Sequence, residues 1–249
     1  MIELKSPKEI DRMRKANHIV WEVLQRLKEI AEPGISTLDL DRIAEEYVRE
    51  RGVRPAFKGL YGFPNALCTS VNEAVVHGIP NSTPLAAGDI VGVDFGAVVD
   101  DYYGDAAITL RLGEVDEETE RLCRVTEECL HRAIARMRIE GRLSDLSHAV
   151  QSHAEAEGFS VVRDYVGHGI GRKPHEEPQV PNYGPPGRGY RLREGLVLAL
   201  EPMINAGTYE TRVLDDDWTV VTADGRMSAH FELTVALTAE GPKILNYDA

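Results

Sequence analysis

Two aspartates lie in a segment that otherwise has the composition of β-strands. Asp94 and Asp105 both fall within residues 90–110, where apolar and β-branched residues predominate. A hairpin whose turn is centred between Val99 and Asp100 would make them cross-strand partners, with Cβ atoms about 4.5 to 5.5 Å apart. Carboxylates at that separation repel each other unless a cation lies between them. Because aspartate is disfavoured within an apolar strand, the hairpin favours a divalent metal site over the alternative that Asp94 is a turn or edge residue.

An imidazole and two further carboxylates stand in comparable places later in the chain. His168 is bracketed by glycines, which permit close approach of the backbone. Glu201 ends the apolar run 196–200, and Glu232 lies in a second apolar segment. A single histidine is more often structural than a ligand. Four carboxylates and one imidazole carried by separate strands, however, suit a pair of divalent ions about 3.5 to 4 Å apart that share bridging oxygens.

The composition excludes several broad classes of protein. With 249 residues, of which 43% are apolar, the chain can bury one substantial core or two small ones that share an interface. A formal net charge of -13 argues against DNA as a partner, because an acidic surface repels the phosphate backbone. No apolar run approaches the roughly 20 residues that cross a bilayer, and residues 1–6 have no signal-peptide pattern. We therefore expect neither a membrane partner nor export.

The cysteines point to a cytoplasmic location. Cys68, Cys123 and Cys129 form no CxxC pair and leave one thiol unpaired in any disulfide scheme, which is typical of reduced cytosolic proteins. Zinc-finger and disulfide-scaffold proteins are thereby excluded. Phosphate-loop, Rossmann and nucleophile-elbow motifs are also absent from the sequence.

The elements that must position these side chains alternate between helices and strands. Residues 6–9 form a capping box with proline at the first helical position, and apolar residues follow at helical spacing. Glycines, prolines and changes of period mark the other boundaries. The predicted helices run over 6–30, from a cap at Thr37 to a stop at Gly52, over 116–139 and over 144–157, and the predicted strands fall between 57 and 113 and at 161–166, 196–200, 219–222 and 231–237.

The order of two helices followed by several strands occurs twice, which raises the question of an internal repeat. An offset of 106 residues places Gly52 on Gly158 and Asp39 on Asp145. These identities are few, so coincidence is the alternative at this point. We interpret residues 1–249 as one domain built from two related halves.

Six short motifs, taken in order, cover nearly the whole chain. They are Val76-His77-Gly-Ile-Pro80, Val93-Asp94 through Gly104-Asp105, Gly167-His168-Gly-Ile-Gly171, Pro174-His175-Glu-Glu-Pro178, Glu201-Pro-Met203 and Phe231-Glu232-Leu-Thr234. With this set the chain resembles the methionine aminopeptidases. Type II members carry a helical insertion of several tens of residues between the positions of His175 and Glu201. Only 25 residues separate those positions here, so the resemblance is to type I.

The resemblance implies an α+β protein with the pita-bread fold of the M24 metallopeptidases, in which two halves related by a pseudo-two-fold axis surround a curved antiparallel sheet. It implies a single catalytic domain that removes the initiator methionine from the N-termini of nascent polypeptides whose second residue is small. It further implies a cytoplasmic monomer with two divalent ions, and Co²⁺, Mn²⁺, Fe²⁺ and Zn²⁺ all suit carboxylate-rich ligands. Docking to the ribosome surface would need a basic patch, and the first predicted helix has only a weak basic excess.

The resemblance also implies which residue binds which metal. Asp94 would chelate the second metal, and His168 and Glu201 would complete the shell of the first. Asp105 and Glu232 would bridge both. Two cations so placed lower the pKa of a water molecule between them and anchor the free α-amino group of the substrate.

Three residues would then carry the chemistry by the same resemblance. Glu201 would act as general base and pass the proton towards the leaving amine. His175 would hydrogen-bond the developing oxyanion, and His77 the scissile amide nitrogen or the backbone beyond it. The implied reaction is metal-assisted hydrolysis of a peptide bond.

The substrate side-chain pocket implied by the resemblance is apolar. Its lining would be Phe57, Leu60, Phe63, Cys68, Pro174 and Trp218. Aromatic rings suit the flexible thioether of methionine. Leu60 stands where the family usually has tyrosine, and Pro174 where an aromatic residue is common. One methylene of misfit changes discrimination by about 1 to 3 kcal/mol, so the chemistry is better supported than strict selectivity for methionine.

Two further departures from the family pattern surround Glu232. His230 replaces a usual glutamine, and Leu233 replaces a usual histidine. Both substitutions are expected to change the volume and polarity of the pocket. His230 has an alternative role as a partner of the metal ligands, because residues two apart on a strand face the same side.

Two alternative functions stay open. An aminopeptidase of the same fold could cleave X-Pro bonds, although such relatives usually have an additional N-terminal domain, for which a helix beginning at Ser6 leaves no room. A peptide-binding module could keep the fold and lose catalysis, although such relatives usually lose metal ligands and all five positions are filled here.

Overall fold

The fold is described by a computed structural model for residues 2–248. Its helices are α1 (Pro7–Ile30), α2 (Thr37–Glu50), α3 (Glu117–Arg136) and α4 (Leu143–Ala156), with a 3-10 turn η1 (Leu60–Gly62). Its strands are β1 (Arg54–Pro55), β2 (Leu67–Val71), β3 (Ala74–Val76), β4 (Ile90–Val99), β5 (Tyr102–Arg111), β6 (Ser160–Val161), β7 (Gly167–Gly169), β8 (Glu176–Val180), β9 (Val197–Leu200), β10 (Met203–Asn205), β11 (Thr211–Val213), β12 (Val220–Thr222), β13 (Ser228–His230), β14 (Glu232–Thr238) and β15 (Gly241–Ile244). The α+β class predicted from the sequence is confirmed.

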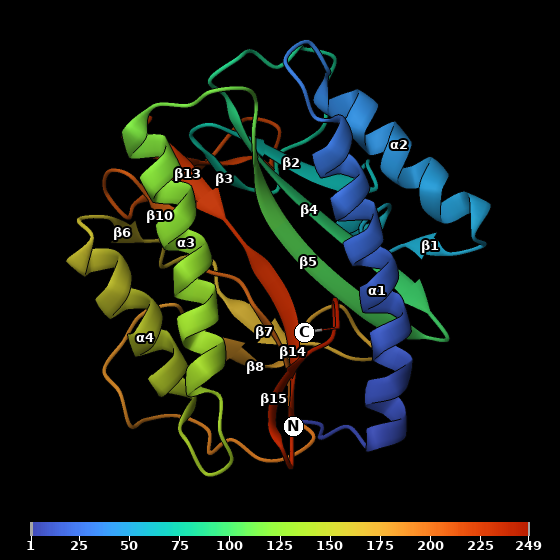
Figure 1. Cartoon of the computed structure of the whole chain (residues 1–249), viewed down its shortest axis with the longest axis vertical. Helices are drawn as coiled ribbons and strands as arrows, with labels where there is room; N and C mark the ends of the chain where they lie inside the picture. Colours follow the sequence, from blue (N-terminus) through green and yellow to red (C-terminus); the bar gives the residue numbers. More distant parts are fainter. Residues whose placement is uncertain (1, 249) are drawn as a thin grey trace.

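A nine-stranded antiparallel sheet forms the body of the molecule. Its order is β1-β4-β5-β14-β9-β7-β8, with β2 also paired to β4 and β15 to β14. In Figure 1, α1 and α2 lie along one half of the curled sheet, and α3 and α4 lie along the other. The halves join where β5 pairs with β14. Smaller sheets, β13-β10-β6 and β11-β12-β3, complete the strand arrangement.

The two halves repeat each other at the offset of 106 residues suggested by the sequence. At this offset α2 coincides with α4 and β1 with β6 at both bounds, and α1 and α3 end at equivalent residues. The equivalent aspartates make equivalent contacts. Asp39 and Asp145 each accept a backbone N–H from the residue that caps their helix, Ser36 at 3.3 Å and Arg142 at 2.9 Å. The repeat is therefore structural and not a coincidence of sequence.

The helix predictions are confirmed, with a correction at the start of α2. Its N-cap is Ser36 and not Thr37, because the Ser36 hydroxyl accepts the Asp39 N–H at 3.1 Å. The Thr37 hydroxyl instead accepts the N–H of Asn81 at 2.8 Å and so holds a distant loop against the helix. Serine and threonine can both cap a helix. Ser36 is the cap here because the Thr37 hydroxyl is engaged by Asn81.

The strand predicted over 161–166 is wrong beyond its first residue. β6 pairs with β10 only at Ser160 and Val161. The chain then leaves the small sheet, and residues 164–166 line a cavity. The β-branched composition favoured a strand here, but the segment has no neighbouring strand along that stretch.

The turn of the β4–β5 hairpin lies one residue later than the sequence suggested. Asp100 and Asp101 have φ angles of 51° and 63°, the positive values that a type I′ turn needs at both central positions. Aspartate is one of the few side chains that tolerate this conformation. The turn is therefore centred between these two residues and not between Val99 and Asp100.

Asp94 and Asp105 are consequently not direct cross-strand partners, and that prediction is wrong. Asp94 is opposite Ala107, and Asp105 is opposite Gly96. A one-residue displacement of the turn changes the register by two, and side chains alternate with period two along a strand. Both aspartates therefore stay on one face of the hairpin as diagonal neighbours.

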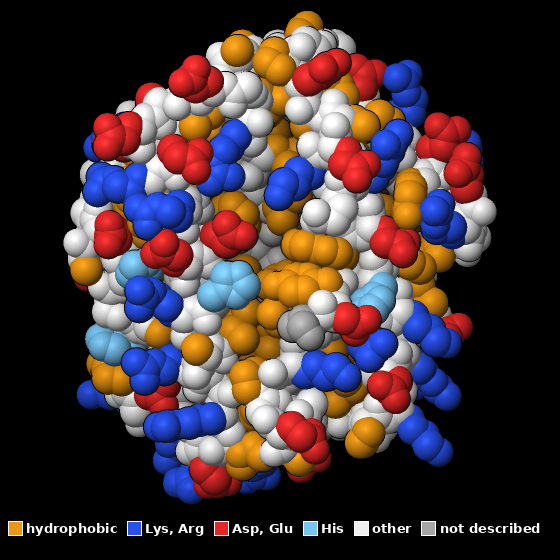
Figure 2. Space-filling model, in the orientation of Figure 1, with side chains coloured by type: hydrophobic (Ala, Val, Ile, Leu, Met, Phe, Trp, Pro, Cys, Tyr) orange, Lys and Arg blue, Asp and Glu red, His pale blue; other side chains and the backbone are white. Residues whose placement is uncertain are grey.

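The outer face of the molecule carries the helices. Figure 2 shows charged side chains of both signs spread over these helices, and hydrophobic side chains gathered between α1 and α3. None of the helices within residues 2–248 is long and apolar enough to cross a membrane.

Helix α1 rests directly on β5 at Gly104. A Cβ atom at this position would lie 2.6 Å from the carbonyl carbon of Ala16 and 2.6 Å from the amide nitrogen of Asn17. Real Cβ atoms do not approach backbone this closely, so only glycine allows the helix to lie against the strand immediately before Asp105.

Gly104→Ala is expected to destabilise the protein, because α1 must move away from β5. We expect the free energy of unfolding, measured by urea denaturation, to fall by about 1 to 3 kcal/mol, the usual range for overpacking. Gly92→Ala on β4 is the matched control, because a Cβ there meets nothing nearer than 3.6 Å. Equal stability of the two variants would contradict the packing argument.

Candidate metal centre

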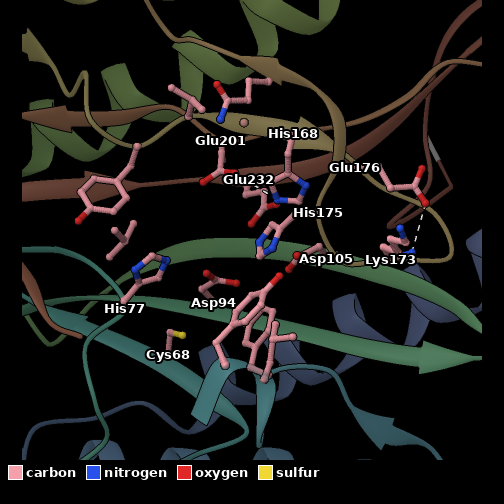
Figure 3. Close-up of a pocket in the computed structure, with 18 of the residues that line it drawn as sticks. Cys68, His77, Asp94, Asp105, His168, Lys173, His175, Glu176, Glu201 and Glu232 are labelled. Atoms are coloured by element: carbon pink, nitrogen blue, oxygen red, sulfur yellow. Dashed lines mark hydrogen bonds and ion pairs between the residues drawn. The ribbon is translucent and has the colours of Figure 1, made fainter. Parts of the chain in front are cut away.

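All five side chains predicted to bind metal line one cavity of about 840 Å³. Figure 3 shows the two aspartates on one side of this cavity and the other three residues on the opposite side, with their polar ends facing one another. The five residues are Asp94, Asp105, His168, Glu201 and Glu232.

Strands of the large sheet position these residues. The first half of the chain contributes Asp94 from β4 and Asp105 from β5. The second half contributes His168 from β7, Glu201 directly after β9, and Glu232 at the start of β14. Because β5 pairs with β14 and β14 with β9, the carboxylates of the two halves meet at the junction between them.

The donor atoms are close enough together to share a cation. Single donor atoms of Asp105, His168 and Glu232 all lie within 4.8 Å of one another. Nε2 of His168 is also 3.4 Å from Oε1 of Glu201. Asp105 and Glu232 are 4% and 2% exposed, so these charges are held away from water.

Burial raises the pKa of every carboxyl in the group, and neighbouring carboxylates raise it further in three of the four. Burial raises the pKa of Asp94 to about 7. The pKa values of Asp105, Glu201 and Glu232 are raised well above the usual range, by burial first and by neighbouring carboxylates second. One oxygen each of Asp94, Asp105 and Glu232 is buried without a hydrogen-bond partner.

A buried carboxylate elsewhere in the chain shows what is absent from this group. Asp41 is 5% exposed. Its oxygens accept hydrogen bonds from Nδ2 of Asn65 at 2.7 Å and from the N–H groups of Ala66 and Leu67 at 2.9 Å. Buried carboxylates are normally satisfied in this way. In the cavity, one oxygen each of three carboxylates lacks such a donor, and these oxygens together with the His168 imidazole are suitable ligands for divalent cations.

The hydrogen bond made by His168 leaves its other ring nitrogen free for a metal. Its Nδ1 is 3.0 Å from the carbonyl oxygen of Gly169. A carbonyl oxygen only accepts, so Nδ1 carries the proton and Nε2 keeps its lone pair, directed towards Glu201. Burial lowers the pKa of His168 to about 4, which keeps the ring neutral as a ligand must be.

His77 enters the cavity from the loop after β3. Its backbone has a φ of 60°, a conformation that is rare outside glycine and that is often found at functional sites. The ring lies edge-on to Tyr165 at 5.6 Å between centroids. Burial, and secondly the charge of His175, lower the pKa of His77 to about 4. At neutral pH the ring is therefore uncharged, with one N–H to donate.

His175 stands at the rim of the cavity, just before β8. Its ring meets that of His168 edge to face at 4.5 Å between centroids, and Tyr61 stacks over it at 6.4 Å. Partial burial lowers the pKa of His175. The next residue, Glu176, forms an ion pair with Lys5 at 2.7 Å, which connects this segment to the residues that precede α1.

The apolar part of the cavity contains the predicted substrate pocket. Phe63 and Trp218 meet edge to face with centroids 5.1 Å apart. Pro174 is buried and does not line the cavity, although the residue after it does. The predicted pocket residues that do line the cavity are Phe57, Leu60, Phe63, Cys68 and Trp218.

His230 and Leu233 lie behind the cavity wall and do not line it. Nε2 of His230 is buried without a hydrogen-bond partner, 3.8 Å from Oε2 of Glu201. His230 therefore lies beside the predicted ligand Glu201, as the alternative role suggested, but 3.8 Å is too long for a direct hydrogen bond. Leu233 packs into the main core because it faces the opposite side of β14 from Glu232. The expectation that Leu233 changes the pocket is therefore wrong.

Sequence reasoning missed two tyrosines of the cavity. Tyr165 contacts His77. It lies three residues before His168 and just outside the Gly167–Gly171 motif, and this nearness was an available signal. Tyr61 is 78% exposed with a φ of 51°. No pattern in the sequence pointed to Tyr61, because its ring stacks on His175, which is far away in the sequence.

Comparison with known proteins gives consistent results. The model of metallopeptidase family M24 matches residues 11–239. The chain is 55% identical over 245 residues to a methionine aminopeptidase of Clostridium perfringens, covering 98% of each chain. A crystal structure of methionine aminopeptidase from Thermotoga maritima superimposes with a TM-score of 0.98 and 46% identity, covering 100% of both chains. The expected pita-bread fold is confirmed.

A more distant likeness bears on the X-Pro alternative. The crystal structure of a prolidase from Pyrococcus horikoshii has a TM-score of 0.79 and 21% identity, covering 99% of this chain but 64% of the prolidase. At that identity the likeness shows a shared fold and no shared specificity.

Asp94→Asn is expected to stabilise the metal-free protein relative to wild type, increasingly as the pH rises from about 4 to about 7. The pKa of Asp94 is raised from 3.8 to about 7 in the folded chain. Ionisation therefore costs stability across this window, and the asparagine avoids that cost. Melting temperatures in chelator measure the difference. Buried histidines oppose this trend in wild type, so the prediction concerns the difference between the two proteins.

Asp11→Asn, at an exposed position on α1, is the control and should show no such pH-dependent difference. Added Mn²⁺ should reverse the order, because the asparagine lacks the ligand charge. A constant difference between Asp94→Asn and wild type from pH 4 to pH 7 would contradict the raised pKa.

Proposed function

The chain belongs to the M24 metallopeptidase family, and on that premise we propose that it is a methionine aminopeptidase. It uses divalent metal to hydrolyse the first peptide bond of a polypeptide and release methionine. The observation that carries this proposal is the juxtaposition of four carboxylates, two of them buried, and a histidine with an apolar pocket in one cavity. Full-length identity to enzymes of that name supports it.

Two divalent cations are proposed to occupy the cavity. Asp94 would hold one cation, His168 and Glu201 the other, and Asp105 and Glu232 both. The unpaired oxygens and the close donor atoms support this assignment. When bound, the cations would lower the pKa of a water molecule and polarise the scissile carbonyl. Co²⁺, Mn²⁺, Fe²⁺ and Zn²⁺ all suit these ligands, and availability would select among them.

The protein's own groups move the proton and stabilise charge. Glu201 takes a proton from the attacking water and delivers it to the leaving amine. His175, at the cavity rim, donates an N–H to the developing oxyanion. His77 hydrogen-bonds the scissile amide nitrogen or the substrate backbone beyond it. Both rings have lowered pKa values, so each is neutral at neutral pH. Each ring can therefore donate an N–H without adding a positive charge that would repel the cations.

The apolar pocket is proposed to hold the methionine side chain. Phe63, Trp218 and Cys68 form a wall that a thioether can contact closely. Leu60, which is partly buried against this cluster, leaves the pocket without the phenol that the family usually has there.

The whole chain, residues 1–249, is proposed to act as one catalytic domain and as a cytoplasmic monomer. Its partners would be the N-termini of nascent polypeptides with a small second residue. The open side of the cavity, with His175 and Tyr61 at its rim, leaves room for the polypeptide that continues beyond the first peptide bond.

Purified protein loaded with Co²⁺ or Mn²⁺ is expected to release methionine from Met-Ala-Ser and to leave Ala-Pro-Ala intact. Amino-acid analysis of the products measures both reactions, and excess chelator should stop the first. Cleavage of Ala-Pro-Ala alone would support the X-Pro alternative. Cleavage of neither peptide by protein that binds the cations would support the peptide-binding alternative.

Glu232→Ala is expected to abolish turnover and reduce metal stoichiometry, because a proposed bridging carboxylate is lost. Metal analysis after gel filtration measures the stoichiometry. Glu177→Ala removes an exposed carboxylate from the same cavity and should keep the wild-type metal content. An active Glu232→Ala variant with full metal content would refute the bridging assignment.

A further inference from the structure

Two buried asparagines lie directly behind Asp105, outside the cavity. Asn17 is on α1, and Asn246 follows β15 near the end of the chain. They are 0% and 1% exposed, and neither lines the cavity. Nothing in the proposed mechanism requires them. Burying two amides is unfavourable unless all their polar atoms are paired.

The hydrogen bonds of the two amides converge on the main chain of Asp105. Oδ1 of Asn17 accepts the N–H of Asp105 at 3.2 Å and an N–H of Asn246 at 3.0 Å. Nδ2 of Asn246 also donates to the carbonyl oxygen of Asp105 at 3.1 Å. On the other side, Oδ1 of Asn246 accepts the N–H of Thr234 at 2.8 Å, and the Thr234 hydroxyl donates to the Asp105 carbonyl at 2.9 Å.

This network occupies a gap in the large sheet. β5 and β14 pair at Ala107 with Glu232 and at Ala106 with Leu233. The same register would next pair Asp105 with Thr234, but the ladder stops there. The amide of Asn246 is inserted between the two strands and bonds to the main chain of both. The strands therefore separate just beside Asp105 and Glu232, whose donor atoms lie within 4.8 Å of each other.

An asparagine suits this position better than other side chains of its size. Its amide supplies a donor for the Asp105 carbonyl and an acceptor for the Thr234 N–H in one planar group. An apolar side chain such as leucine would leave the Thr234 N–H without its partner and would remove one of the two donors to the Asp105 carbonyl. A buried orphan group is costly. Asn17 completes the arrangement, and it reaches Asp105 because Gly104 lets α1 lie against β5.

We propose that Asn17 and Asn246 are positioning residues of the metal centre, which set the separation between the Asp105 and Glu232 carboxylates by holding β5 and β14 apart. The inference rests on the proposed two-cation site. It assigns a role in metal affinity to Asn17 on α1 and to Asn246 near the C-terminus, although neither residue lines the cavity. The amides do not touch the substrate and take no part in proton transfer.

Asn246→Leu is the test, with Asn205→Leu as its matched control. Asn205 is also 0% exposed, and its amide pairs with Thr208 and Ser228 and with no predicted ligand. Each full-length variant is titrated with Co²⁺, and affinity is measured by calorimetry together with the visible absorption spectrum of the bound ion. The melting temperature of each metal-free variant is measured separately.

We expect Asn246→Leu to weaken Co²⁺ binding about 10- to 100-fold, the range seen when residues supporting metal ligands are replaced, and to alter the Co²⁺ spectrum. Asn205→Leu should lower the melting temperature but keep the wild-type affinity and spectrum. Should Asn246→Leu fail to fold, Asn246→Ser, whose hydroxyl is too short to join both strands, should show the same weakening.

Two results would overturn the inference. One is wild-type Co²⁺ affinity and spectrum in Asn246→Leu or Asn246→Ser. The other is an equal loss of affinity in Asn205→Leu, because the effect would then be general destabilisation. Failure of the wild-type protein to bind two Co²⁺ ions would instead contradict the proposed function, so the two failures are distinguishable.

Discussion

Four carboxylates share one cavity, and their mutual repulsion is the constraint on which the rest of this structure depends. Burial raises the pKa of all four, and neighbouring carboxylates raise it further for Asp105, Glu201 and Glu232. Like charges in a poorly solvated site destabilise a fold unless opposite charge accompanies them. The cavity is therefore suited to bind cations. Its carboxylates do not stabilise the metal-free fold, so that stability must come from the core and the helices.

The duplicated architecture divides the proposed ligands between its two halves. The first half brings Asp94 and Asp105 on one hairpin, and the second brings His168 on β7, Glu201 directly after β9 and Glu232 on β14. The β5–β14 pairing that joins the halves lies at the centre of the ligand group. Helices and an apolar core on the outer side of the sheet supply the packing that holds this junction together.

The supports for the ligands differ in kind from the ligands themselves. One oxygen each of Asp94, Asp105 and Glu232 lacks a hydrogen-bond partner, whereas the main chain of Asp105 is fully engaged by Asn17, Asn246 and Thr234. The Asn182 amide likewise bonds to the carbonyl oxygen of Glu201 at 3.0 Å. Unsatisfied side chains on a satisfied backbone are what a preorganised metal site requires, because the donor atoms stay free while their positions are fixed.

The sequence by itself determined the helices, the family and the set of ligand candidates, because these depend on local periodicity and on residue types within short motifs. It suggested the repeat offset, which the structure then confirmed. Asp94 and Asp105 were recognisable because carboxylates are out of place on apolar strands. Their register was not, since the turn at Asp100 and Asp101 depends on which residues adopt positive φ, and several polar residues there could do so.

Only the tertiary structure decided which residues lie behind the site and which lie in it. Pro174 and Leu233 are near ligands in sequence and yet face away from the cavity. Asn17 and Asn246 are separated by most of the chain and yet share a hydrogen bond at 3.0 Å. Nearness in sequence constrains the path of the backbone but not the direction of each side chain. Contacts between distant segments form only when the complete sheet and its helices have packed together.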